Sequence, residues 1–217
     1  MKKKLPNVTL IAVSSIEIPQ TVWALEKCCE QIDFGSVKFI SHQEPDYIPD
    51  NITFKYTPQI TDIMMYNHLC FSGLSRYVPT SHCLLIQYDS CIINPELWDD
   101  SWLQYDYIGA PWPYKDDAYI IDETGEHIRV GNGGFSLRSK KLLDAPERFN
   151  LRLTHKQGYY NEDSNICEYH RKELLALGIK YAPIEVAAKF SYENDVPENK
   201  DTKTFGFHKN LPRYLCQ

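Results

Sequence analysis

Short apolar runs alternate with segments of helical periodicity over the first 90 residues, and this alternation limits the fold more than any other feature. Three apolar runs predict buried strands, at Val8–Val13, Val37–Ser41 and Cys83–Tyr88. Between them, Gln20–Ile32 and Ile63–Tyr77 carry apolar side chains three or four residues apart, which predicts two helices. Strands that alternate with helices are typical of an α/β fold, whose active residues follow the carboxyl ends of the strands.

The second half of the chain is less regular. Strands are expected at Tyr105–Ala110 and at Val130–Arg138, although three glycines interrupt the second of them. Glycines inside a strand usually mark a bulge or a close approach by a ligand or by another part of the backbone. Helices are expected over 140–146, capped by Ser139, and over 162–177, with Gly178 as the C-cap. No repeat or linker divides the sequence, so we expect one domain over residues 1–217.

Composition excludes several classes of protein. The 217 residues carry a formal net charge of −6, which argues against nucleic acid as a partner because clustered Lys and Arg hold phosphate backbones. Aromatic residues make up 13% of the chain. Aromatic rings suit sugars and bases, but they also fill cores, and the core interpretation is favoured.

The sequence also bears on cellular location. No apolar stretch approaches the roughly 20 residues that cross a bilayer, so no transmembrane segment is expected. The basic start, Lys2 to Lys4, precedes an apolar run too short for a signal peptide, and three charges allow at most weak contact with a membrane surface. The seven cysteines show no Cys-x-x-Cys spacing, so we expect small buried thiols rather than disulfides or a zinc ribbon. These features predict a cytoplasmic protein.

Two acidic sites stand at the ends of predicted elements. Asp89 follows the third apolar run, where a carboxylate can hold a hard divalent cation or simply form a turn. Glu162 and Asp163 begin a predicted helix, where one of them can act as a general base or both can complement the helix dipole.

Two further segments have polar or conformational features that suit a ligand. The run Gly131–Gly134 lacks the spacing of a Rossmann or Walker loop, but its backbone amides can face a polar ligand. His208 can ligate Mn²⁺ and Lys209 can neutralise a diphosphate, although residues near a terminus are usually just solvated.

Taken in order, these segments resemble a family of largely uncharacterised glycosyltransferases of the GT-A fold, found in microbes and viruses. The similarity extends over about residues 8–210, and it is carried by five segments together: Gln87-Tyr88-Asp89, Tyr107–Trp112 (YIGAPW), Val130–Ser139 (VGNGGFSLRS), Asn161-Glu162-Asp163 and Phe205–His208. The resemblance implies a single GT-A-like domain with a mixed central sheet flanked by helices. It implies an enzyme that moves a sugar from a nucleotide-diphosphate donor, expected to be a UDP-sugar, to a hydroxyl of a glycan or glycoprotein.

The resemblance also assigns roles to residues. Asp89 and His208 would hold Mn²⁺ or Mg²⁺, in an Asp-x-Asp element that keeps only its last carboxylate. Trp112 would stack on the acceptor. The donor would be bound by Ser14, Arg76, Gln87, Tyr88, Asn132, Gly133, Gly134 and Lys209.

The acidic pair Glu162-Asp163 matches the pair that inverting GT-A enzymes use, with Asp163 as the base, so an inverting reaction is favoured. The same order of segments is also similar to glycogenin-like retaining enzymes, in which the equivalent acidic residue orients the sugar. Two further functions fit a chain of this kind: a non-catalytic carbohydrate-binding relative of the same fold, and a nucleotidyltransferase. The nucleotidyltransferase is disfavoured, since Val13–Ile16 is not the glycine-rich basic loop that such enzymes carry after the first strand.

Overall fold

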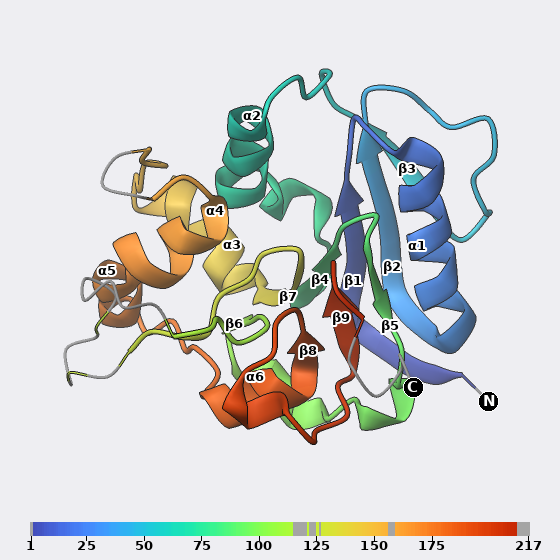
Figure 1. Ribbon diagram of the computed structural model, residues 1–217. Coiled ribbons are helices and arrows are strands. Elements are labelled where there is room, and N and C mark those ends of the chain that lie inside the picture. Colours follow the sequence, from blue (N-terminus) through green and yellow to red (C-terminus); the bar gives the residue numbers. More distant parts are fainter. Residues whose placement is uncertain (1, 115–120, 122–124, 126, 156–158, 212–217) are drawn as a thin grey trace.

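The computed structural model describes residues 2–114, 121, 125, 127–155 and 159–211. Six strands form a mixed central sheet, in the order β3-β2-β1-β4-β7-β6 (Figure 1). Its first four strands are parallel, and β7 runs antiparallel to both of its neighbours. The strands are β1 (Lys3–Val13), β2 (Ile32–Ser41), β3 (Thr53–Tyr56), β4 (His82–Ile86), β7 (Phe135–Ser139) and β6 (Tyr107–Ile108).

A second, three-stranded sheet has the order β5-β9-β8. It consists of β5 (Ser90–Ile92), β9 (Gly206–His208) and β8 (Ser191–Tyr192). An aromatic cluster lies next to β9 and joins the two sheets, with ring centroids 5.3–6.0 Å apart. Its members are Trp98, Trp102, Phe135, Phe190 and Phe205. These rings confirm the expectation that much of the aromatic content fills the core.

Helices cover both faces of the central sheet because β1 and β4 are apolar on both faces. Leu10 and Leu84 pack on the side of α1 (Ile18–Gln31), whereas Ile11 and Leu85 pack toward the helical segment that begins at α2 (Ile63–His68). The remaining helices are α3 (Lys140–Arg148), α4 (Glu162–Ser164), α5 (Arg171–Ala176) and α6 (Ile184–Phe190). The α/β fold with a mixed sheet between helices is therefore confirmed. Among the described residues, no helix is long and apolar enough to span a membrane.

Several predicted boundaries differ from the structure. The strand expected to reach Tyr88 ends at Ile86, and the edge strand β3 was not predicted. The strand expected from Val130 begins only at Phe135, because Asn132 adopts a left-handed φ of 46° and its Oδ1 accepts the amides of Gly134 and Phe135. The polar side chain thus forms a local turn in place of strand pairing.

The helical predictions are largely correct. Asp62 caps α2 through the amides of Met64 and Met65, and Ser139 caps α3 through the amide of Leu142. The helix expected over 162–177 is interrupted by a wider turn over Asn165–Tyr169, and Gly178 ends it with a φ of 75°. The described cysteines are free thiols and five of the six are buried, as the sequence predicts.

Candidate functional site

The register of the second sheet brings Asp89 and His208 together. β4 ends at Ile86, residues 87–89 turn, and the chain continues as β5. Ser90 in β5 pairs with His208 in β9, and the amide of Lys209 donates to the carbonyl of Asp89 at 2.9 Å. Residues that are 119 positions apart in the sequence therefore become neighbours at the carboxyl end of a central strand.

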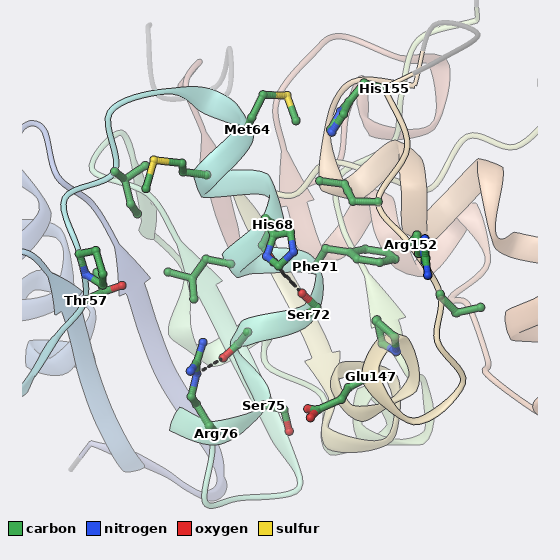
Figure 2. A pocket seen from close by; sticks show the side chains of 18 of the residues that line it. Thr57, Met64, His68, Phe71, Ser72, Ser75, Arg76, Glu147, Arg152 and His155 are labelled. Carbon is green, nitrogen blue, oxygen red and sulfur yellow. Dashed lines mark hydrogen bonds between the residues drawn. The ribbon is translucent and has the colours of Figure 1, made fainter.

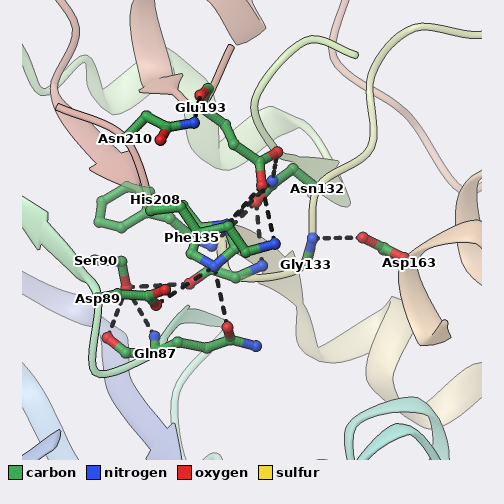
Figure 3. A network of polar contacts seen from close by, with 12 residues as sticks. Gln87, Asp89, Ser90, Asn132, Gly133, Phe135, Asp163, Glu193, His208 and Asn210 are labelled. Carbon is green, nitrogen blue, oxygen red and sulfur yellow. Dashed lines mark hydrogen bonds and ion pairs between the residues drawn. The ribbon is translucent and has the colours of Figure 1, made fainter. Parts of the chain in front are cut away.

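His208 is at the centre of a buried polar network (Figure 3). The residue is only 3% exposed, and its Nε2 lies 3.0 Å from Gln87 Oε1 and 3.5 Å from Asp89 Oδ1. On the other side of the ring, Nδ1 lies 3.0 Å from Glu193 Oε1. Asp89 and His208, which the sequence singles out separately, therefore lie within 3.5 Å of one another.

This set of residues fits a divalent cation. Asp89 Oδ1 is buried and forms no hydrogen bond with the described residues. An orphaned buried carboxylate oxygen calls for an explanation such as an ion. Asp89 and Gln87 supply oxygen and His208 a ring nitrogen, a donor set that suits Mn²⁺, or less well Mg²⁺. Over the described ranges, no cluster of three His, Cys, Asp or Glu residues forms a complete metal site, so further ligands would have to come from elsewhere.

Glu193 is part of the network, although no sequence motif points to it. It follows β8, it is 8% exposed, and its second oxygen accepts from the side-chain amide of Asn132. Lys209 Nζ lies 3.5 Å from Glu193 Oε1, with its side chain 59% exposed. Burial opposes the charge on Glu193, but the hydrogen bond from His208 and the nearby Lys209 hold its pKa below the ordinary value.

Asp163 lies at the edge of the same network. Gly133 N–H donates to its Oδ2 at 2.8 Å, and Ser164 N–H donates to its Oδ1 at 2.7 Å. Burial and the nearby charge of Glu162 raise the pKa of Asp163 to about 6, against the lowering effect of the two amides. A carboxylate with a pKa near neutrality is suited to proton transfer.

Glu162, in contrast, is committed to an ion pair. Its Oε1 lies 2.8 Å from Nη2 of Arg138, and both side chains are almost completely buried. Burial makes the loss of either partner costly, because the remaining charge would be buried without a partner. Glu162 therefore acts on Asp163 through its charge, and its own carboxylate is turned toward Arg138.

The glycine-rich segment is shaped by side chains that lie against it. A Cβ on Gly131 would come within 1.9 Å of Trp112, one on Gly133 within 2.2 Å of Glu162, and one on Gly134 within 2.2 Å of His208. The amide of Gly134 donates a hydrogen bond to Asn132 Oδ1, and the amide of Gly133 donates one to Asp163 Oδ2. Both amides are used within the chain, so contact of Gly133 or Gly134 with a donor sugar stays a prediction.

A pocket of about 330 Å³ lies beside the network, at the carboxyl ends of β1 and β4. It brings together three residues predicted to bind the donor, namely Ser14, Gln87 and Tyr88. Tyr66 also lines it, and its hydroxyl accepts from Gln87 Nε2 at 2.8 Å. Tyr88 lines the pocket and is 41% exposed, so part of the residue is open to a ligand.

Two predicted residues lie elsewhere. Arg76 lines a separate pocket of about 1320 Å³ between α2 and the segment after α3, where its Nε donates to the carbonyl of Gly73 at 3.0 Å (Figure 2). The structure does not bring Arg76 to the network around Asp89. Trp112 is half-buried, with its indole packed against Gly131, so much of the ring surface is used in packing.

The fold matches solved glycosyltransferase structures along nearly the whole chain. The galactosyltransferase LgtC, solved with donor and acceptor sugar analogues, gives a TM-score of 0.55 at 12% identity, with 94% of this chain and 87% of that one covered. A glycosyltransferase involved in glycosylation of the major capsid of PBCV-1 gives a TM-score of 0.55 at 12% identity, with 96% of this chain and 95% of that one covered. The glycosyltransferase GlyE of Streptococcus pneumoniae TIGR4 gives a TM-score of 0.52 at 10% identity, with 97% of this chain and 55% of that one covered. The fold is that of GT-A glycosyltransferases.

The sequence also defines the family of the chain. Residues 47–208 match the family described as protein of unknown function (DUF5672), and the chain belongs to this family. The match includes each of the network residues from Gln87 to His208. Among curated proteins, none matches the sequence.

Proposed function

We propose that this protein is a metal-assisted glycosyltransferase that moves a sugar from a UDP-sugar to a hydroxyl of a glycan or glycoprotein. One observation carries the proposal above all. Two acceptor oxygens, Asp89 Oδ1 and Gln87 Oε1, lie together with the ring nitrogen His208 Nε2 beside a pocket at the end of β4, and no described residue donates a hydrogen bond to Asp89 Oδ1. Such a set attracts a cation, and a cation in turn holds a diphosphate.

The donor would lie across the pocket of about 330 Å³ and the network. The partly exposed Tyr88 would stack on the base, and Ser14 lies at the end of β1, where the ribose would be held. The exposed Lys209 would face the diphosphate, whose negative charge its ammonium group offsets. A bound Mn²⁺ or Mg²⁺ would stabilise the charge that develops on the leaving diphosphate.

Asp163 is the proposed general base. With a pKa of about 6 it is ionised at neutral pH, and the two amides that bind its oxygens fix its orientation. A base at this position supports an inverting reaction, with the acceptor hydroxyl near Trp112. In a retaining reaction, Asp163 would instead orient the donor sugar and take no proton.

The test replaces Asp163 by asparagine, which has nearly the same shape but cannot act as a general base. Asp163→Asn should lower sugar transfer by about 10²–10⁴-fold and leave UDP affinity unchanged, because a general base contributes to turnover and not to nucleotide binding. Asp144→Asn serves as the control, since Asp144 is a half-exposed carboxylate on α3, paired with Lys140 outside the network. Transfer and binding are measured with the same panel of nucleotide-sugars.

Unchanged turnover in the Asp163→Asn variant would exclude Asp163 as the base. Sugar or nucleotide binding by the wild type without transfer from any donor would favour a non-catalytic carbohydrate-binding protein. The anomeric configuration of the product, read by NMR, separates the inverting from the retaining reaction.

A further inference from the structure

A buried carboxylate contacts His208 on the side of its ring that faces away from Asp89. Glu193 reaches this position through the second sheet, in which β8 runs parallel to β9 and Tyr192 pairs with Phe207. Glu193 follows this pair directly after the end of β8, and His208 follows it as the last residue of β9. Nothing in the sequence spacing of 193 and 208 indicates their contact, since it depends on the register of two short strands.

The contact determines where the imidazole carries its proton. A carboxylate only accepts hydrogen bonds, so the 3.0 Å contact between Glu193 Oε1 and His208 Nδ1 requires a proton on Nδ1. Asn132 Nδ2 lies 3.2 Å from the same Nδ1, but this amide group donates to the nearer second oxygen of Glu193. The amide is oriented in turn, because Asn132 Oδ1 accepts the amide of Gly134 at 3.1 Å. Both oxygens of Glu193 are therefore fixed by buried donors.

With the Nδ1 proton held by Glu193, the proton that a cation would displace to solvent is the one on Nε2, and its loss leaves a lone pair at Nε2. This atom faces Gln87 Oε1 at 3.0 Å and Asp89 Oδ1 at 3.5 Å. The amide group of Gln87 is oriented by its Nε2, which donates to the Tyr66 hydroxyl at 2.8 Å, so its oxygen is the atom turned toward His208. Gln87 Oε1 only accepts, so Nε2 donates to it while no cation is bound, and a cation beside Asp89 Oδ1 would take the place of that proton.

We propose that Glu193 is a positioning residue for metal binding: it holds the proton of His208 on Nδ1 and so directs Nε2 to the cation shared with Asp89. The inference rests on the proposed function, which supplies the metal. Carboxylates that bind the outer nitrogen of a ligating histidine orient the ring and increase its basicity, and their loss typically weakens metal binding by 10–100-fold.

The test measures the affinity for Mn²⁺ alone, without nucleotide, by electron paramagnetic resonance at neutral pH. Glu193→Gln keeps the size of the side chain but removes its charge, and we expect it to bind Mn²⁺ about 10–100-fold more weakly than the wild type. The matched control is Glu198→Gln, because Glu198 is also a carboxylate whose two oxygens accept hydrogen bonds, in its case from Arg129, but it lies outside the network. The control should bind Mn²⁺ like the wild type.

A second measurement needs no variant of Glu193. The nitrogen NMR spectrum of histidine-labelled wild-type protein with Cd²⁺, a diamagnetic substitute, should show the proton of His208 on Nδ1. In this tautomer Nε2 is free to bind the cation while Nδ1–H donates to Glu193, and the opposite tautomer would exclude both contacts. The signal is assigned with His208→Gln, and circular dichroism of each variant without metal checks that it folds.

The outcomes distinguish the role of Glu193 from the metal site itself. If the wild type binds Mn²⁺ and Glu193→Gln binds it equally well, or if His208 carries its proton on Nε2 with Cd²⁺ bound, the role of Glu193 is overturned and the proposed function stands. If the wild type itself does not bind Mn²⁺, the metal site of the proposed function fails and the role of Glu193 fails with it.

Discussion

At the scale of single residues, Asp163 combines a proposed catalytic role with a cost to stability. Its folded pKa of about 6 lies above the ordinary value of 3.8, so the folded protein binds a proton that the unfolded chain has released between about pH 4 and pH 6. The tighter binding of this proton by the folded protein stabilises it. That stabilisation is complete below about pH 4 and is lost as pH rises through about 6.

The consequence for stability is measurable against Asp163→Asn, which cannot ionise. Between about pH 5 and pH 7.5, the free energy of unfolding of the wild type should fall by about 1.4 kcal/mol relative to that of the variant. Urea unfolding at the two pH values gives this difference, and any constant offset from the loss of one of the two amide hydrogen bonds, from Gly133 or from Ser164, cancels. A difference between the two proteins that does not change with pH would contradict the raised pKa.

At the scale of elements, the second sheet builds the site. β5, β9 and β8 carry or adjoin the residues that form the network, namely Asp89, His208 and Glu193. The glycine-rich segment completes it, because Gly134 leaves room for the ring of His208. The sequence indicates that these glycines allow a close approach, and the structure identifies the approaching groups as side chains of the chain itself.

A side chain added at Gly134 should displace the ring of His208. In Gly134→Ala, the new methyl group would lie 2.2 Å from the ring, and we expect a loss of about 1–3 kcal/mol of stability together with weaker Mn²⁺ binding. The control is Gly125→Ala, where nothing lies within 4 Å but φ is +86°. The control should lose about 1–2 kcal/mol through backbone strain alone. Both variants are assayed by thermal unfolding and Mn²⁺ binding, and equal Mn²⁺ affinities would mean that Gly134 does not position His208.

At the scale of the whole molecule, the sequence predicts the α/β class because β1, β2 and β4 contain apolar runs with amphipathic helices between them. The sequence also indicates Asp89, Gln87 and His208 as candidate site residues. Their assignment to one site rests on the family resemblance and not on any one of these residues. Three features of the site could not be predicted: the contact of Glu193, the pairing of Arg138 with Glu162, and the separation of Arg76 from the network. Each depends on strand register or on the direction of a side chain, which periodicity does not encode.

The central proposal is that a nucleoside diphosphate and a divalent cation bind together at Asp89. The most direct test is thermal unfolding with UDP, GDP, CDP or dTDP, each with and without Mn²⁺, in the wild type and in Asp89→Asn. A ligand at about 100 times its dissociation constant adds about 2.7 kcal/mol, which in a chain of this size is a shift of about 5–10 °C. We predict such a shift for UDP in the wild type, dependent on Mn²⁺ and lost in the variant. No shift with any nucleotide, or the same Mn²⁺-dependent shift in Asp89→Asn, would contradict the proposal.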